Sequence, residues 1–220
     1  MSRAPRVVIF DLMGTLLRGD ATWRYWEDIG RFLEVQGSRS ATSFAQRYSE
    51  WRRSRTHSLR EVPLRERIVM FAEASEAQLA AIETSFLEEY YRHTCVMDGA
   101  TQMLERWNGH AALGVVSNFF LADAPRELLR AHQLLQYFDF VFDSAQVGIR
   151  KPDRAIFECA LNASTGMVQP SEATMIGDNW QADVEGALAV GMRAIHFSST
   201  DTHDGRVPIL QTWHDFRPAA

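Results

Sequence analysis

The sequence predicts an α/β protein, in which a Rossmann-like parallel sheet core carries an inserted all-α helical bundle. Short apolar runs rich in β-branched residues alternate with segments of helical spacing, which is typical of a doubly wound parallel sheet. Between residues 19 and 93 helical spacing alone prevails. Because this block interrupts the alternation after the first strand, we expect residues 1–18 and 94–220 to form the core. Residues 19–93 are then expected to form a lid over the C-terminal edge of the sheet.

The core elements follow one another in strand–helix order. The run Val7–Phe10 is short, apolar and β-branched, which predicts a buried parallel strand. Further strands are expected at 113–116, 138–142, 173–176 and 193–197, with a last short strand and turn in the tail at 208–216. Helices are expected at 100–107, 127–131, 153–162 and 182–190. Gly109 and Gly191 follow two of these helices, as is usual at a helix end.

The lid is predicted to contain four amphipathic helices without strands. Its apolar residues recur at helical spacing in four groups, at 23–33, 44–51, 64–71 and 79–90. Asp20 and Ser75 are the expected N-caps, and Ser75 has Gln78 three residues later, as in a capping box. The linkers at 16–19 and 93–97 are expected to act as hinges.

Composition limits the classes of function. The chain has 220 residues, 46% of them hydrophobic, and a net charge of −5. No run of basic residues is long enough to follow a phosphate backbone, so we expect a small-molecule substrate and no nucleic acid. The first apolar run is too short for a signal peptide or a membrane span, and Cys95 and Cys159 form no CxxC pair. We therefore expect a cytoplasmic protein with reduced thiols; nothing in the sequence indicates an oligomeric state.

Three carboxylates lie at predicted strand ends. Asp11 ends the first strand and precedes a glycine turn, where it can attack phosphorus or carbon to give a covalent aspartyl intermediate. Asp178 follows a later strand, and Asp183 comes five residues after it. Together they offer three hard oxygen donors, which suit octahedral Mg²⁺ completed by water and a substrate oxygen. The competing interpretation is that Asp178 and Asp183 only cap a helix and interact with its dipole.

Anion-binding groups lie at two other predicted strand ends or helix starts. Ser117 and Asn118 follow a strand, where the Ser117 hydroxyl and the next backbone N–H can donate to a phosphate. Lys151 is the only lysine among 23 basic residues, the other 22 being arginine. A compact ammonium that neutralises both the nucleophile and a phosphate explains this choice, and chance is the competing explanation.

Together, these four segments resemble the four motifs of the haloacid dehalogenase (HAD) superfamily, and the resemblance extends over the whole chain. The lid resembles the α-helical C1-type cap that is inserted just after the first motif. The resemblance implies a Mg²⁺-dependent phosphohydrolase that acts on a small phosphorylated metabolite through an aspartyl phosphate on Asp11. It implies that phosphate is held by Thr15, Ser117, Asn118 and Lys151, and Mg²⁺ by Asp11, Asp178, Asp183 and the backbone carbonyl of Met13.

Met13 departs from the family pattern. HAD phosphatases usually carry a second aspartate at this position, which protonates the leaving group and then activates water. A thioether can do neither, and acid–base help of this kind is worth about 10²- to 10⁴-fold in rate. Alkyl phosphates are therefore expected to be poor substrates, whereas acyl phosphates and phosphoanhydrides need less help because their leaving groups are stable anions.

Three interpretations remain open for this departure. The protein is a phosphohydrolase whose acid comes from the lid, with His57 and His93 as candidates, or whose leaving group needs no acid. Alternatively it is a 2-haloacid dehalogenase, although HAD dehalogenases lack the metal-site aspartate that Asp178 matches. The third interpretation is a catalytically impaired protein that binds a phosphorylated ligand. Phosphonatase chemistry, which needs a lid lysine, is excluded because the lid has none.

Candidate substrate contacts in the lid are aromatic and cationic. Trp23 and Trp26 follow the first motif closely, and Trp51 and Arg47 belong to an arginine-rich segment that suits an anionic or ring-bearing substrate. The same spacing also fits a bundle core with a solvated outer face, which is the competing interpretation.

Overall fold

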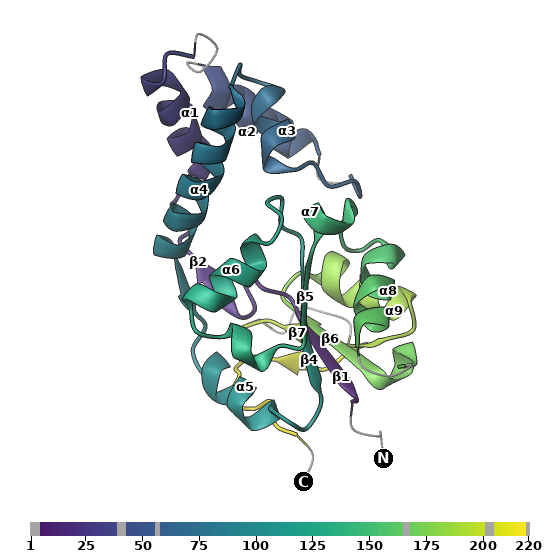
Figure 1. Ribbon diagram of the computed structural model, residues 1–220. Helices are drawn as coiled ribbons and strands as arrows, with labels where there is room; N and C mark the ends of the chain where they lie inside the picture. Colours follow the sequence, from purple (N-terminus) through teal and green to yellow (C-terminus); the bar gives the residue numbers. More distant parts are fainter. Residues whose placement is uncertain (1–4, 39–42, 56–57, 165–167, 201–204, 219–220) are drawn as a thin grey trace.

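The structure, a computed structural model, describes residues 5–38, 43–55, 58–164, 168–200 and 205–218. A group of helices stands above an α/β core (Figure 1). The core sheet has the order β5-β4-β1-β6-β7-β8, and every pairing in it is parallel, which confirms the predicted fold class. Its strands are β1 Val7–Phe10, β4 Ala112–Ser117, β5 Phe140–Asp143, β6 Ala173–Gly177, β7 Arg193–Phe197 and β8 Ile209–Leu210.

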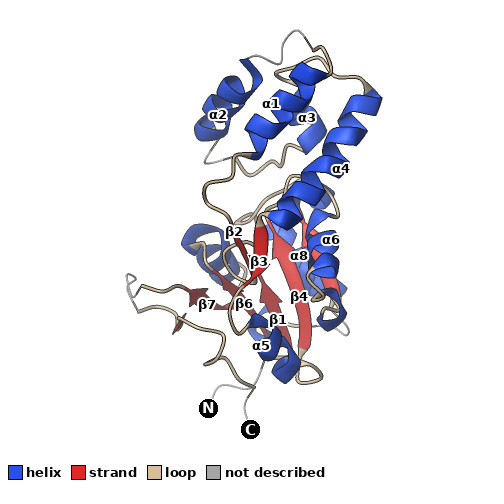
Figure 2. Ribbon diagram, turned by 90° about the vertical axis from the view of Figure 1, so that its left-hand side faces the viewer, coloured by secondary structure: helices blue, strands red, loops and turns tan. Residues whose placement is uncertain are grey.

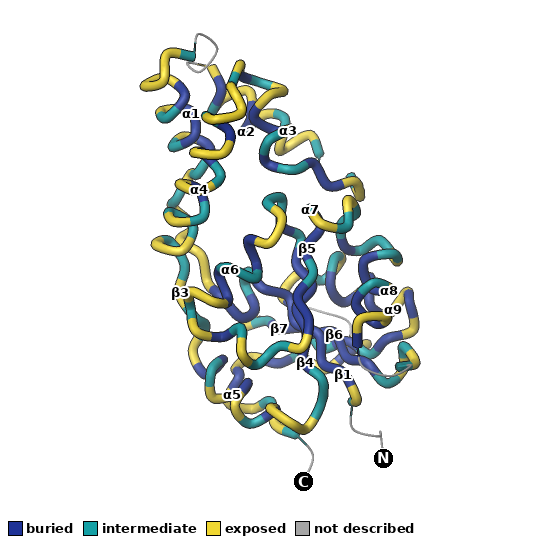
Figure 3. The backbone as a smooth tube through the Cα atoms, in the orientation of Figure 1, coloured by how far each residue is buried: buried dark blue, intermediate teal, exposed yellow. Residues whose placement is uncertain are grey.

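Helices cover both faces of this sheet (Figure 1). They are α5 Ala100–Trp107, α6 Ala124–Ala131, α7 Ser144–Val147, α8 Arg154–Ala163 and α9 Gly186–Ala189. Val8 and Phe10 pack into the apolar core shared with α5 and α6, whereas Val7 and Ile9 pack into the core shared with α8 and α9. Because both faces of β1 are covered, its sequence is a continuous apolar run, and Figure 3 shows the central strands as buried.

Some element boundaries differ from the predicted ones. Strand β5 begins at Phe140 instead of 138, because Leu135–Tyr137 (η2) forms a 3₁₀ turn just before it. Helix α6 begins at Ala124, with Pro125 in its first turn, where the missing N–H of proline costs no hydrogen bond. The helix expected at 182–190 begins earlier, with a π-helical turn at Trp180–Glu185 (η4). A further 3₁₀ turn, η3, spans Pro170–Glu172.

The helical segment between β2 and β3, which we call the cap, contains the four predicted helices. They are α1 Tyr25–Val35, α2 Phe44–Ser54, α3 Leu64–Val69 and α4 Glu76–Arg92. The capping box at Ser75 is confirmed, since Ser75 and Gln78 exchange side chain–backbone hydrogen bonds. The N-cap predicted at Asp20 is wrong: α1 begins at Tyr25, and the Asp20 carboxylate accepts a 2.8 Å hydrogen bond from Thr22 N. None of the described helices is long and apolar enough to cross a bilayer.

Two linkers join the cap to the core, and they pair with each other. Strand β2, Leu17–Gly19, runs antiparallel to β3, Thr94–Val96, and the pair lies between cap and sheet (Figure 2). Backbone hydrogen bonds therefore tie the two expected hinges into one ribbon, a pairing that the sequence did not predict.

The cap also contacts the core far from this ribbon. Arg150 N donates to Leu59 O over 2.7 Å, and Glu61 N donates to Gly148 O over 2.9 Å. Leu64 N, at the start of α3, donates to Phe120 O over 2.8 Å. The cap segment before α3 therefore lies against the core loop that leads directly into Lys151.

Candidate active site

Three carboxylates converge at the C-terminal edge of the sheet. Asp11 follows β1 and Asp178 follows the adjacent strand β6, while Asp183 lies in the π-helical turn η4. Each offers an oxygen atom that lies within 4.8 Å of the others. Asp11 and Asp183 are buried, and Asp178 is exposed toward solvent. The structure thus brings together the three acidic residues that the sequence analysis had assigned to a metal.

Two glycines make room for these carboxylates. A Cβ atom on Gly14 would lie 2.2 Å from Asp178 Oδ2, and a Cβ atom on Gly177 would lie 2.2 Å from Asp183 Oδ2. Gly14 also has φ +88°, a conformation that L side chains rarely adopt. The glycines of the first and fourth motifs are therefore steric requirements of the acidic cluster.

Lys151, the single lysine of the sequence, supplies an ammonium at this cluster. Its Nζ donates to Asp11 Oδ1 and to Val116 O, both over 2.7 Å, and lies 2.6 Å from Asp183 Oδ1. The side chain is almost fully buried, at 1% exposure. Burial lowers the pKa of Lys151, but the attraction of Asp11 and Asp183 outweighs it and holds the pKa above its ordinary value. Lys151 is therefore a charged group that binds both carboxylates.

Asn118 fixes the backbone of this lysine. Its Oδ1 accepts from Lys151 N over 2.7 Å, and its Nδ2 donates to Lys151 O over 2.9 Å. The Asn118 side chain thus positions Lys151. For the phosphate contact that the sequence predicts at this position, Asn118 can offer only its backbone N–H. Ser117, the last residue of β4, is buried beside it.

The electrostatics of the cluster favour a cation. Burial raises the pKa of Asp11 to about 7, with Lys151 opposing this rise and the negative charges of Asp183 and Asp178 adding to it. Three carboxylates against one ammonium leave an excess of two negative charges when all are ionised. Asp183 Oδ1 is buried and, within the described residues, has no hydrogen-bond partner beyond its ion-pair contact with Lys151. Such a donor set fits a divalent cation with a preference for oxygen ligands.

Thr15 has a structural role in the described site. Its Oγ1 accepts a 3.1 Å hydrogen bond from Asp178 N, and its carbonyl accepts a 2.9 Å hydrogen bond from the buried indole of Trp213. The Thr15 side chain therefore holds the end of β6 against the first turn. Met13 lies in the same turn and forms an isolated β-bridge with Leu17. Its side chain lies beside Gly19, where an added Cβ atom would be 3.3 Å from Met13 Cε.

The candidate pocket residues of the cap separate into three places. Trp23 and Trp26 line a cavity of about 560 Å³ beside the linker ribbon. Trp51 lines a different cavity, of about 210 Å³, between cap and core. Arg47 lines neither; its guanidinium donates to Phe71 O over 3.1 Å and stacks on the Phe71 ring.

Two histidines were candidates for a proton donor. His93 stacks on Trp23 with ring centroids 4.7 Å apart, and its Nδ1 lies 3.4 Å from Asp20 Oδ2. His93 therefore lies at the linker end of the first cavity. His57 lies outside the described residues.

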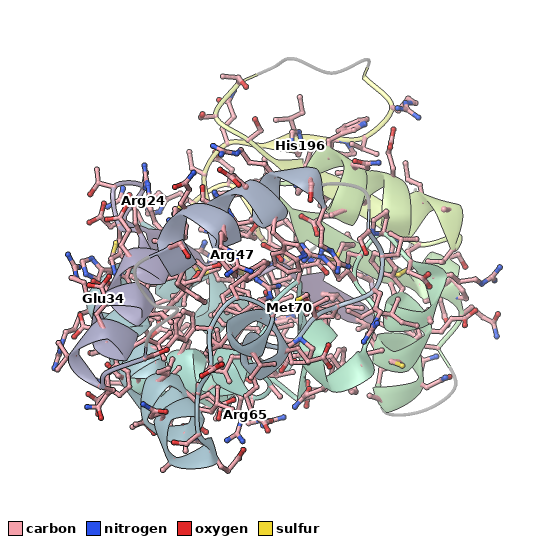
Figure 4. All side chains as sticks on the ribbon, turned by 90° about the horizontal axis from the view of Figure 1, so that it is seen from above. Arg24, Glu34, Arg47, Arg65, Met70 and His196 are labelled. Atoms are coloured by element: carbon pink, nitrogen blue, oxygen red, sulfur yellow. The ribbon has the colours of Figure 1, made fainter. Side chains whose placement is uncertain are left out.

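Two residues of the site were missed from the sequence. Tyr90 lines the cavity of Trp23, and burial together with the charge of Asp11 raises its pKa to about 12. His196, on β7, has its Nε2 3.0 Å from Asp178 O, and Figure 4 labels it beside the yellow-green C-terminal part of the chain. Tyr90 belongs to the apolar stripe of α4 and His196 to a buried strand, so neither had a pattern that marked it as part of the site.

Comparison with known proteins decides the family. Residues 5–191 match the haloacid dehalogenase-like hydrolase family, which covers most of the chain. The chain belongs to this family. Its parallel sheet core, flanked by helices, is that of a HAD-like hydrolase.

Individual relatives agree with this assignment. A phosphoserine phosphatase of Thermus thermophilus is 31% identical over 86% of this chain and 87% of its own length. The fold is similar to that of a HAD phosphatase from Thermococcus onnurineus, with 23% identity, a TM-score of 0.73, and coverage of 96% and 95% of the two chains. It is also similar to a magnesium-bound HAD-hydrolase from Bacillus subtilis, with 19% identity, a TM-score of 0.67 and 97% coverage of both.

Proposed function

We propose that this HAD-like hydrolase is a Mg²⁺-dependent phosphohydrolase that acts on a small phosphorylated metabolite through an aspartyl phosphate on Asp11. The observation that carries the proposal is the contact of Lys151 Nζ with both Asp11 and Asp183, two members of the acidic cluster. Curated relatives named as phosphatases, such as the phosphoserine phosphatase of Thermus thermophilus, support the phosphoryl chemistry.

The proposed site assigns a role to each group. Asp11, Asp178, Asp183 and the backbone carbonyl of Met13 would hold Mg²⁺, which supplies positive charge next to the phosphate when bound. The Ser117 hydroxyl and the Asn118 N–H would donate to phosphate oxygens. Thr15 would contribute through the turn it supports.

The proposed reaction has two displacements at phosphorus. An Asp11 oxygen attacks phosphorus, and the bond from phosphorus to the leaving oxygen breaks, with its electron pair leaving on that oxygen. Lys151 neutralises Asp11 before the attack and the phosphate oxygens during it. Water then attacks the aspartyl phosphate, breaks its bond to Asp11 and yields inorganic phosphate.

Met13 shapes the choice of substrate. No carboxylic acid lies at this position to protonate a departing alkoxide. The proposal therefore favours leaving groups that are stable anions, such as those of acyl phosphates and phosphoanhydrides. The acidic cluster argues against a metal-free dehalogenase, because Asp178 matches the metal-site aspartate that HAD dehalogenases lack.

The cap and the core are separate parts of the proposed enzyme. We propose residues 19–93 as a C1-type cap over a core made of residues 1–18 and 94–220. The described cysteines Cys95 and Cys159 are free, in keeping with a reducing, cytoplasmic environment.

The test is a substrate panel with and without Mg²⁺. Acetyl phosphate, glycerol phosphate and 2-chloropropanoate are incubated with the protein and with Asp11→Asn, and phosphate and chloride are measured. The proposal predicts Mg²⁺-dependent phosphate release from acetyl phosphate that Asp11→Asn abolishes. Chloride release without metal, or phosphate release that persists in Asp11→Asn, contradicts it.

A further inference from the structure

An arginine-walled cavity lies between the cap and the core. It has a volume of about 210 Å³, and its charged lining consists of Arg52, Arg55, Arg60, Arg67, Arg150 and Glu61. Arg52 belongs to α2, Arg60 to the segment before α3, and Arg150 to the core. The cavity therefore exists only where the cap rests on the core.

The charge balance of this cavity is strongly positive. Five arginines line it against one carboxylate, that of Glu61. Arg60 is also paired with Glu66 over 3.3 Å, but both of those side chains are exposed. Even with both carboxylates counted, an excess of three positive charges remains, in a chain whose net charge is −5. Such a concentration of like charge favours the entry of an anion.

The floor of the cavity is a buried ion pair that is already complete. Arg67 Nη2 donates to Glu61 Oε1 over 2.8 Å, with both side chains almost fully buried. Glu61 also accepts a hydrogen bond from Ser144 of the core, and Arg150 Nη1 lies 3.5 Å from Glu61 Oε2. Because the Glu61 carboxylate is already bound by these partners, it neutralises the charge of Arg67 and is not available to neutralise Arg52, Arg55 and Arg60.

Aromatic rings lie against the guanidinium groups of two of the outer arginines. The guanidinium carbon of Arg52 lies 4.6 Å from the centre of the Trp26 ring, and that of Arg55 lies 5.2 Å from the centre of the Trp51 ring. Within the described part of the chain, the Arg52 guanidinium makes no hydrogen bond or ion pair, whereas Arg55 Nη2 donates to Ser58 Oγ and to Arg60 O. Stacking on a ring face fixes the plane of a guanidinium while its edge stays available for a bidentate oxyanion.

The cavity adjoins the proposed site through the backbone. Arg150 and Lys151 are consecutive, so their Cα atoms are about 3.8 Å apart. The side chain of Lys151 reaches Asp11, and the side chain of Arg150 lines the cavity. A ligand that bridges the two places would contact Lys151 with one anionic group and the arginines with the other, and would thereby join the cap to the core.

We infer that this cavity binds a second oxyanion group of the substrate, a phosphate or a carboxylate remote from the phosphoryl group that Asp11 attacks. The inference rests on the proposed function, because it assumes that the substrate's scissile phosphate lies at Lys151. It narrows the substrate class to small metabolites that carry two anionic ends.

The test compares substrates that differ only at the remote end. One series consists of the bisphosphates of diols from ethylene glycol to hexanediol, and another of the corresponding phosphooxy carboxylates. Each compound is paired with the monophosphate of the same chain length, whose remote end is a hydroxyl. Both members of a pair release an alkoxide, so the slow turnover expected with Met13 affects both alike and cancels in the ratio of their kcat/KM values. These ratios are measured for the wild type, for Arg52→Gln/Arg60→Gln, and for the control Arg31→Gln. All three arginines are exposed, and Arg31, like Arg60, is paired with a surface carboxylate.

For the wild type, kcat/KM is expected to be at least about tenfold higher for the doubly anionic substrate at one or more chain lengths. The kcat/KM of each bisphosphate is first halved, because either of its two identical phosphates can react. The double variant is expected to reduce this preference to within about twofold, and Arg31→Gln to retain it. No preference at any length, or an equal loss in Arg31→Gln, overturns the inference.

Binding separates this inference from the proposed function. Calorimetric titration with the matching bisphosphonates and hydroxyalkyl monophosphonates needs no turnover. In one outcome, no phosphate is released, but the bisphosphonate binds more tightly than the monophosphonate, and only the double variant loses this difference in affinity. The proposed function is then wrong, and the cavity assignment stands. If phosphate is released without any preference for two anionic ends, the cavity assignment falls and the proposed function stands.

Discussion

Lys151 Nζ donates a 2.7 Å hydrogen bond to Asp11 Oδ1, although 140 residues separate the two in the chain. Both side chains are buried, and Asp183 lies against the same ammonium. Taking charges out of water is costly unless they are paired, so this arrangement is stable only because its members neutralise one another. The ammonium therefore holds Asp183, one of the proposed metal ligands, while it neutralises Asp11.

Replacement of this lysine is expected to separate metal binding from catalysis. Lys151→Met removes the ammonium, so kcat for acetyl phosphate should fall by about 10²- to 10³-fold or more. Mg²⁺ should bind more tightly, because three carboxylates are left without their cation. Calorimetry and steady-state kinetics measure the two effects. Arg154→Gln, which removes an exposed cation of α8, should change neither, and unaltered Mg²⁺ affinity in Lys151→Met would argue against a shared site.

An acid restored at position 13 is expected to help the poorest substrates most. Met13→Asp should raise kcat for glycerol phosphate by about 10²- to 10⁴-fold, because an alkoxide needs a proton to leave. The gain for acetyl phosphate should be far smaller, since acetate leaves as a stable anion. Rates with both substrates provide the comparison, and equal gains for both would show that the variant acts through something other than proton donation.

The close approach of Gly14 to Asp178 gives a steric prediction. Gly14→Ala places a methyl group 2.2 Å from Asp178 Oδ2, so the carboxylate must move and turnover should fall by about 10²-fold, with weaker Mg²⁺ binding. Gly109→Ala is the matched control, because Gly109 has φ +79° but no atom within 4 Å of its Cβ position. Both variants should lose about 1–2 kcal/mol of stability from the backbone alone. Equal Mg²⁺ affinities in the two variants would remove the steric argument.

Asp143 is expected to make stability depend on pH. Burial raises its pKa from 3.8 to about 6, against hydrogen bonds from the backbone N–H groups of Gln146 and Asp123. Because the folded protein binds this proton more tightly than the unfolded chain, the carboxyl favours folding below about pH 4. This contribution is lost as the pH rises through 6.

The matching variant isolates that contribution. Asp143→Asn removes the titration, so its unfolding free energy minus that of the wild type should fall as the pH falls from 7 to 4. Urea unfolding at several pH values measures the difference. Asp153→Asn, at the N-cap of α8, is the control for loss of a capping carboxylate. A difference that is constant with pH would mean that Asp143 is not titrating in this range.

Much of the fold and the acidic cluster could be predicted from sequence. The ends of parallel strands meet at one edge of a sheet, so residues placed after β1, β4 and β6 had to lie near one another. Lys151 was marked by composition, as the one lysine in an arginine-rich chain. These signals are local, and adjacent strand pairing makes them converge.

The remaining features depend on contacts between distant segments. Leu17–Gly19 is too short to show a strand pattern, so its pairing with Thr94–Val96 had no sequence signal. The clamp of Asn118 on Lys151 joins two segments of the core that lie 33 residues apart in the chain. The effect of the Asp11 charge on Tyr90 arises only where the cap and the core meet. Asp20 resembled an N-cap, but its side chain closes a local turn instead.

The most direct measurement is identification of the covalent intermediate. The protein is mixed with acetyl phosphate and Mg²⁺, quenched in acid, and digested for mass spectrometry of acyl phosphates. The account predicts a phosphoryl group on Asp11 that forms only with the divalent ion and is absent from Asp11→Asn. Phosphorylation of another residue, or full turnover with no acid-stable aspartyl phosphate on Asp11 under single-turnover conditions, would contradict it.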